Sequence, residues 1–330
     1  MDKNTIFTRV QKCLETVPVM LIGTGATIPL GIPGMGGLSA HLISTLDDKY
    51  KRDTSWNEIK GKLDNGMGLE SALTDVTLAD ALVNDIVEKT WELIVEADIS
   101  VFNRCILNRE TLPLSNLINK FYQVHPKCIN IITTNYDRMV EYACDQKRIQ
   151  YDTRFQGGYI RHFSTSKVGN KDVVNIFKIH GSLDLFKDAS GLVCSIPGQH
   201  KTLPVGFLPE IISPGISKYK AVLTSSCRNI LIESAPLINN ASSFLCIGYG
   251  FNDEQIQTDI IAQIRTGKPI VVLTQAVSPT AKSLIDSNSS NYILIEENPE
   301  KKNSTRFTID KNQYCLDGDF WTIDGLTQII

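Results

Sequence analysis

Four short segments of the chain combine small and polar residues in an order that could do chemistry. They are residues 23–27, 133–137, 180–184 and 248–253. Two glycines after a strand would let backbone N–H groups approach a phosphate closely. The amide of Asn135 can both donate and accept, so it could orient a water or a ribose hydroxyl. His180 beside Gly181 has room for a ligand and could act as a general base near neutral pH.

Each segment also has a purely structural interpretation. Residues 23–27 could be a tight strand-to-helix turn, and they match neither a Walker A loop nor G-x-G-x-x-G, since residue 28 is Ile. Asn135 could cap the following helix, with Asp137 as a charge in its first turn. His180 could be a half-buried histidine. Residues 248–253, where Tyr249 could instead stack on a ring or ribose, could be a turn capped by Asn252 or Asp253.

The elements around these segments decide whether they can act together. Short apolar runs predict strands at about 17–22, 128–132, 173–179, 243–247, 269–273 and 292–295. Helical patterns lie between them, which predicts an α/β fold: a Rossmann-like, mostly parallel sheet with helices on both faces. All four segments follow strands, and such carboxyl ends share the ligand-binding edge of a sheet. Together they fit a dinucleotide, with phosphates on the first segment and a reactive ribose near Asn135 and His180.

The pattern further predicts a single domain over residues 1–330. Its Rossmann-like core covers about 4–38, 128–184 and 225–300. A helical insertion covers about 39–127, a loop-rich small module about 185–224, and a strand and helix extension about 301–330. Within the insertion we expect helices at 78–97 and 99–107, and an apolar stripe formed by Leu78, Leu82, Ile86, Trp91 and Ile94. The stripe either packs within the insertion or marks where a neighbouring subunit binds.

Composition excludes several classes of protein. Apolar residues make up 42% and charged residues 21%, which is globular rather than disordered. The net charge is −3 without a block of like charges, so no nucleic-acid surface is indicated. We expect a cytoplasmic protein, because the apolar runs are too short for a membrane span and no secretory signal is visible. None of the eight cysteines forms a C-x-x-C pair, so neither a structural zinc nor a disulfide framework is expected.

The four segments resemble one known family. Residues 23–27 with Gly31-Ile32-Pro33 resemble the sirtuin signature G-A-G-x-S followed by G-I-P. Residues 134–137 resemble its T-Q-N-I-D segment, His180-Gly181 its catalytic H-G, and residues 247–253 the G-Y-S-F-x-D segment of the bacterial SIR2-like branch. The resemblance extends over about residues 17–275.

The chain departs from the deacylating sirtuins in three places. It lacks their four-cysteine zinc module, their G-I-P-D-F-R becomes G-I-P-G-M-G, and no peptide-pairing segment is recognisable after His180. It is more similar to the divergent SIR2 group of bacterial anti-phage systems. That resemblance implies hydrolysis of NAD+ to nicotinamide and ADP-ribose, which depletes NAD+ in the infected cell. It also implies a homo-oligomer, or a partner such as a HerA-like ATPase or an Argonaute-type sensor.

The resemblance also implies roles for particular residues. Asn135 and His180 would be catalytic, without a metal, and Asp137 would lie near the nicotinamide carboxamide. The remaining NAD-binding residues would be Gly23, Gly25, Ala26 and Thr27 at the diphosphate, Gly248, Tyr249 and Thr274 near the adenosine, and Pro33 and Thr134. Two alternatives remain: an NAD-dependent protein deacylase, for which we see no acyl-peptide channel, and a non-catalytic NAD or ADP-ribose scaffold, which would not require both Asn135 and His180.

Overall fold

A nine-stranded sheet forms the centre of the molecule in the computed structural model, which describes residues 1–74, 76–215 and 225–330. Its strand order is β14-β13-β12-β11-β10-β1-β2-β6-β3, and the strands from β12 to β3 all run parallel. Their bounds are β1 (Val19–Ile22), β2 (Cys128–Thr133), β3 (Tyr151–Asp152), β6 (Val173–Lys178), β10 (Phe244–Ile247), β11 (Ile270–Leu273) and β12 (Tyr292–Glu297). The mostly parallel α/β sheet predicted from the sequence is confirmed.

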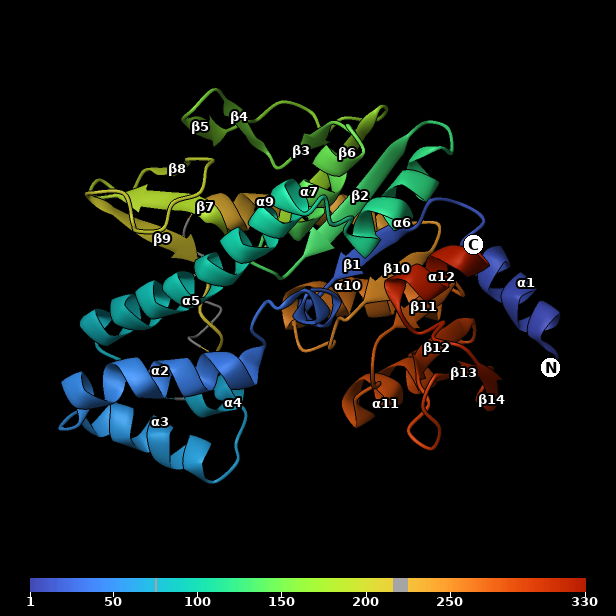
Figure 1. Ribbon diagram of the computed structural model, residues 1–330, viewed down its shortest axis with the longest axis horizontal. Helices are drawn as coiled ribbons and strands as arrows, with labels where there is room; N and C mark the ends of the chain where they lie inside the picture. Colours follow the sequence, from blue (N-terminus) through green and yellow to red (C-terminus); the bar gives the residue numbers. More distant parts are fainter. Residues whose placement is uncertain (75, 216–224) are drawn as a thin grey trace.

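Helices cover both faces of this sheet (Figure 1). Alternate strand residues explain the two layers: Met20 and Ile22 of β1 belong to one core, and Val19 and Leu21 belong to the other. The first core is covered by α1 (Lys3–Cys13), α6 (Pro113–Tyr122), α7 (Met139–Gln146) and α12 (Ile323–Ile329), and the second by α9 (Ser225–Asn240), α10 (Glu254–Arg265) and α11 (Pro279–Asn288). Strands buried on both sides are largely apolar, as residues 19–22 and 270–273 show.

A helical module lies between β1 and β2 in the sequence. It contains α2 (Met35–Tyr50), α3 (Thr54–Asp64), α4 (Leu69–Leu73) and α5 (Asp80–Leu107). The helices expected at 78–97 and 99–107 are one continuous helix, and α2 begins at Met35 although Gly36 and Gly37 follow. α6, within the expected insertion, instead packs on β2 and α7 and covers the sheet.

The apolar stripe of α5 packs within this chain. Leu82 and Ile86 are buried against α2, α3 and α4, while Trp91 and Ile94 join the core of the main sheet. These four side chains are therefore not available to a neighbouring subunit. An interface that involves this helix would have to use its other face.

A second, antiparallel sheet corrects the prediction of a loop-rich module at 185–224. Its strand order is β4-β5-β8-β7-β9, and the part of the prediction at 216–224 lies outside the described residues. The strands are β4 (Phe155–Gly157), β5 (Arg161–Phe163), β7 (Gly181–Asp188), β8 (Val193–Ser195) and β9 (Phe207–Ile211). β4, β5 and β8 have only three residues each, too few to show an alternating pattern, and Pro209 is tolerated because β9 is an edge strand.

The C-terminal segment extends the large sheet. β13 (Ser304–Ile309) pairs antiparallel with β12, and β14 (Asn312–Asp317) pairs with β13. Asp310 and Lys311 between them both have positive φ angles, 51° and 66°, which suits a tight two-residue hairpin turn. The sequence predicted a strand and helix extension at about 301–330, and the structure has two strands followed by α12 (Ile323–Ile329).

Candidate active site

The four segments meet at one edge of the large sheet, as predicted. They follow β1, β2, β6 and β10, which are neighbours in the order β10-β1-β2-β6. The chain passes from β1 to the β2 side first and returns later to β10, so the edge lies at a topological switch point. A cavity of about 180 Å³ lies there, and the predicted residues that line it are Gly23, Pro33, Thr134, Asn135, Asp137, His180, Gly248 and Tyr249.

The glycines after β1 and β10 bring two loops into backbone contact. Gly25 N–H donates to the Gly248 carbonyl at 3.1 Å. Gly248 has a φ of +56°, and a Cβ atom there would lie 2.2 Å from the Ala26 nitrogen. Only glycine can meet both conditions. The interpretation of these glycines as close-packed turn residues is therefore correct, although Gly23 and Gly248 also line the cavity.

Most N–H groups of residues 23–27 are not available to a phosphate in this conformation. Four of them donate to backbone carbonyls: Gly23 to Ile247, Gly25 to Gly248, Ala26 to Gly23 and Thr27 to Thr24. Gly25, Ala26 and Thr27 do not line the cavity that the described residues form. The sequence missed another source of donors, the N-terminus of α2, where Gly34 and Met35 line the cavity and Gly34 provides no side-chain cap.

Hydrogen bonds of its amide nitrogen hold the Asn135 side chain in place, while its amide oxygen has no hydrogen-bond donor among the described residues. Nδ2 donates to the Gly23 carbonyl at 3.1 Å and lies 3.3 Å from Thr27 Oγ1. The Oδ1 atom is buried and accepts no hydrogen bond from any residue that the structure describes. Asn135 does not cap α7, whose N-cap residue is Arg138. An orphaned acceptor in the wall of a cavity is suited to a water or a hydroxyl of a ligand.

Asp137 is a buried carboxylate two residues further on. Its Oδ2 accepts from Thr27 Oγ1 at 3.0 Å, and its Oδ1 accepts from the Met139 N–H at 3.2 Å. Burial raises the pKa of Asp137 to about 6, although the charge of Lys178 acts in the opposite direction. The group therefore changes its charge near neutral pH. Thr27 lies behind the cavity wall and connects Asp137 to Asn135.

His180 forms a pair that the sequence did not reveal. Its Nε2 lies 2.5 Å from Oδ2 of Asp253, and the side chains are 14% and 4% exposed. Asp253 also caps α10 by accepting from the Gln255 N–H, as one interpretation of the sequence held. Donation from Nε2–H to Asp253 leaves Nδ1 of His180 as the basic nitrogen. From the sequence, Asp253 could be predicted only as a helix cap, because its pairing with His180 depends on how β6 and β10 are arranged in the sheet.

Segments from outside the four predicted loops complete the cavity wall. Glu70 of α4 and Ile94 of α5 come from the helical module, and Ile212, Ser213 and Pro214 follow β9 of the second sheet. None of these five residues was predicted to belong to the site.

Thr274 follows β11, and its N–H donates to the Ile295 carbonyl at 3.1 Å. It does not line the described cavity.

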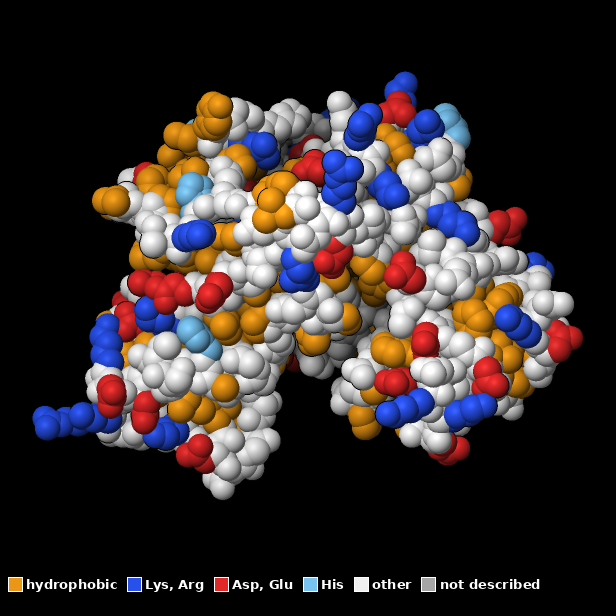
Figure 2. Space-filling model, in the orientation of Figure 1, with side chains coloured by type: hydrophobic (Ala, Val, Ile, Leu, Met, Phe, Trp, Pro, Cys, Tyr) orange, Lys and Arg blue, Asp and Glu red, His pale blue; other side chains and the backbone are white. Residues whose placement is uncertain are grey.

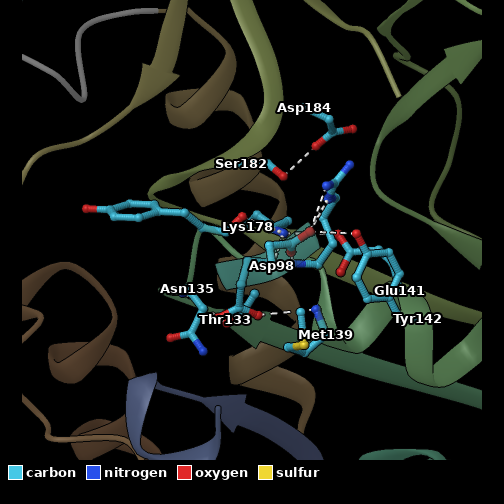
Figure 3. Close-up of polar contacts among 12 residues, drawn as sticks. Asp98, Thr133, Asn135, Met139, Glu141, Tyr142, Lys178, Ser182 and Asp184 are labelled. Atoms are coloured by element: carbon cyan, nitrogen blue, oxygen red, sulfur yellow. Dashed lines mark hydrogen bonds and ion pairs between the residues drawn. The ribbon is translucent and has the colours of Figure 1, made fainter. Parts of the chain in front are cut away.

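A buried cation supports the loop that carries Asn135 and Asp137 (Figure 3). Lys178, at the end of β6, donates from Nζ to the carbonyls of Tyr136 and Asp137 and to Oε1 of Glu141. The pKa of Glu141 is raised by burial, against the effect of Lys178. The loop after β2 is thus anchored from the strand that leads to His180.

Within residues 1–74, 76–215 and 225–330, no three His, Cys, Asp or Glu side chains are grouped as a metal site would require. Among the helices described, none has the length and apolar character needed to cross a membrane.

Comparison with known proteins identifies a family. A family model described as a SIR2-like domain matches residues 129–305, more than half of the chain. No curated protein matches the chain.

Several solved Sir2 structures resemble the fold at low identity. A mutant Sir2 homologue in complex with ADP-ribose is 15% identical, with a TM-score of 0.48, covering 88% of this chain and 90% of that one. Sir2Tm bound to a propionylated peptide is 13% identical with a TM-score of 0.46, and Sir2 with a p53 peptide and NAD+ is 12% identical with a TM-score of 0.42. Both alignments cover 88% of this chain and 92% of the other. At such identities the likeness concerns the fold alone.

Proposed function

Because this chain belongs to the SIR2-like domain family, we propose that it is an NAD+ glycohydrolase that cleaves NAD+ into nicotinamide and ADP-ribose. One observation carries the proposal. The cavity at the switch point of the sheet brings together the orphaned Oδ1 of Asn135 and the pair of His180 with Asp253. A binding scaffold would need neither an oriented acceptor for water nor a paired histidine.

Cleavage of the nicotinamide–ribose bond passes through a transition state with positive charge at C1′. The C1′–N bond breaks, a water forms the new C1′–O bond, and the proton of that water must be removed. Asn135 Oδ1 orients the water or a ribose hydroxyl, and Nδ1 of His180 takes the proton while Asp253 holds the ring. Asp137 lies near the nicotinamide carboxamide.

In this conformation the cavity has room for only part of the dinucleotide. A cavity of about 180 Å³ is below the about 300–1,000 Å³ that is usual for larger ligands. Pro33, Gly34 and Met35 form one wall, and we infer that residues 29–37 move outward to admit the whole dinucleotide. The first N–H groups of α2, next to that wall, would then be suited to the diphosphate.

We further propose that the enzyme is the effector of a bacterial anti-phage system. The support is the similarity of residues 247–253 to the bacterial SIR2-like branch. Hydrolysis of NAD+ would stop growth of the infected cell before phage is released. Unregulated hydrolysis would harm the host, so activity would depend on oligomerisation or on a partner such as a HerA-like ATPase.

Release of free nicotinamide from NAD+ by the purified protein, alone and with candidate partners, tests this proposal. Asn135→Ala and His180→Ala should each lose about 10²–10⁴-fold in rate. His162→Ala, an exposed histidine on β5, should keep the wild-type rate. Nicotinamide release that requires an acylated peptide would indicate a deacylase, and NAD+ binding without turnover in every assembly would indicate a scaffold. Either result contradicts the proposal.

A further inference from the structure

Helix α5 contacts the loop that carries Asn135 and Asp137 through a fully buried carboxylate (Figure 3). Asp98 Oδ1 accepts from the Arg138 backbone N–H at 2.8 Å. Its Oδ2 accepts from Arg138 Nε and Nη2, at 3.1 and 2.7 Å, and from the Tyr142 hydroxyl at 2.6 Å. One side chain therefore fixes both the backbone and the side chain of the residue that follows Asp137.

The same helix contacts the loop after His180. Trp91 is completely buried, and its Nε1–H donates to the Leu183 carbonyl at 2.9 Å. Its ring also packs edge-on against Phe186, with the centroids 6.0 Å apart. Leu183 lies in β7, three residues after His180, so this bond fixes the backbone of the strand that follows the histidine.

The two loops are also bonded to each other. The Leu183 N–H donates to the Tyr136 carbonyl at 3.1 Å, and Lys178 Nζ donates to the same carbonyl at 3.2 Å. Trp91 and Asp98 are seven residues apart, about two helical turns or about 10 Å along one face of α5. A single helix, α5, thus contacts the backbone of both segments that carry the proposed catalytic side chains.

We propose that α5 is the element that aligns the two catalytic loops, with Asp98 and Trp91 as positioning residues. The inference rests on the proposed NAD+ cleavage for its functional consequence. Small errors in alignment have large effects on rate because the reacting groups must meet within a narrow range of geometries. Because α5 also forms the core of the helical module with α2, its displacement would disturb both loops together.

The experiment compares variants of α5 in the full-length chain. Asp98→Ala would leave the buried Arg138 guanidinium without its carboxylate partner, so Asp98→Asn is the milder choice. Trp91→Phe keeps an aromatic ring but removes the N–H donor. The control is Asp85→Asn, on the same helix, because Asp85 accepts from Lys49 and from the Tyr50 hydroxyl of α2 and contacts neither loop.

Hydrogen exchange and steady-state kinetics provide two independent measurements. We expect amides of residues 134–140 to exchange at least about tenfold faster in Asp98→Asn, and those of 181–186 in Trp91→Phe. In both variants kcat for NAD+ should fall at least about tenfold with little change in KM, since alignment rather than ground-state binding is lost. Asp85→Asn should leave exchange in both loops and kcat unchanged.

The outcomes separate this inference from the proposed function. If wild type cleaves no NAD+ in any assembly, the proposed function fails, and the exchange data alone decide the positioning role. Wild-type exchange in both loops of both variants would overturn the inference. Equal loosening of the loops by Asp85→Asn would also overturn it, because the effect would then be general destabilisation.

Discussion

Asn135 and Asp137 lie two residues apart, and a single hydroxyl connects them. Thr27 Oγ1 lies 3.3 Å from Asn135 Nδ2 and donates to Asp137 Oδ2 at 3.0 Å. A hydroxyl that accepts from one group and donates to the other fixes both side chains at once. The family resemblance implied that Thr27 lies at the diphosphate, whereas in this structure its side chain supports Asn135 and Asp137 behind the cavity wall.

Replacing Asp137 tests how much the burial of its ionised carboxylate lowers the folding stability. Asp137→Asn keeps the shape and one acceptor but removes the charge. Because the folded pKa of about 6 lies above the ordinary 3.8, the folded state holds its proton more tightly than the unfolded state. Stability from this group is therefore complete below about pH 4 and is lost as pH rises to about 6. We expect Asp137→Asn to be more stable than wild type at pH 7.5, by on the order of 3 kcal/mol at most.

Chemical denaturation at pH 4 and pH 7.5 measures this difference. The two proteins should have similar stability at pH 4, and the variant should be the more stable at pH 7.5. Equal stability at both pH values would contradict the assignment of a raised pKa. The same variant should lose NAD+ cleavage if the carboxylate contacts the nicotinamide.

At the scale of the elements, two loops determine the shape of the site by packing backbone on backbone. The loop after β10 approaches the loop after β1 so closely that Gly248 leaves no space for a side chain. The cavity wall on that side is therefore a rigid contact between two strand ends. On the opposite side, His180 directly precedes β7, and the residues after β9 close the cavity.

Gly248→Ala should therefore destabilise the protein by more than the strain of an alanine at a positive φ angle alone. The new Cβ would lie 2.2 Å from the Ala26 nitrogen, so the two loops would have to separate. The matched control is Gly267→Ala, where φ is +93° and a Cβ would meet no atom within 4 Å. Both variants should lose about 1–2 kcal/mol of folding stability, because an alanine is strained in the left-handed backbone conformation. Thermal unfolding should show a clearly larger loss for Gly248→Ala, and equal losses would refute the close contact.

At the scale of the whole molecule, the helical module has a wide groove on the outer side of α5. The groove has a volume of about 840 Å³ and lies between α5 and the segment around Lys201. Glu88, Glu92 and Glu96 line it at helical spacing, and Figure 2 shows acidic side chains gathered along this helix. Since the apolar stripe faces inward, the subunit contact that we propose would have to use this outer side of α5.

Glu88→Lys and Glu92→Lys should shift oligomer size and NAD+ cleavage together. A reversed charge at the edge of the proposed interface opposes association, and the subunit contact would then no longer support α5 and, through it, the catalytic loops. Light scattering combined with nicotinamide release measures both quantities. Glu58→Lys on α3, an exposed glutamate outside the groove, serves as the control. A monomer that cleaves NAD+ at full rate without a partner would rule out this regulation.

The sequence alone determined the large sheet and the meeting of its loops. Apolar runs such as residues 19–22 and 270–273 specify strands buried on both faces, and the polar residues after each strand must then gather at one edge. That reasoning brought Asn135 and His180 into one cavity. It could not reveal the second sheet, whose short strands are formed by pairing with one another rather than by a local pattern.

The tertiary structure decided which polar groups are partners. The pairing of Asp253 with His180, of Asp98 with Arg138 and of the Trp91 indole with Leu183 joins segments that are far apart in the sequence. The periodic pattern of apolar residues in a sequence indicates which side chains are buried, but not which group each buried polar side chain contacts. The partner of a buried polar group depends on which segments become neighbours in space, because each such group must find a hydrogen bond wherever the fold provides one.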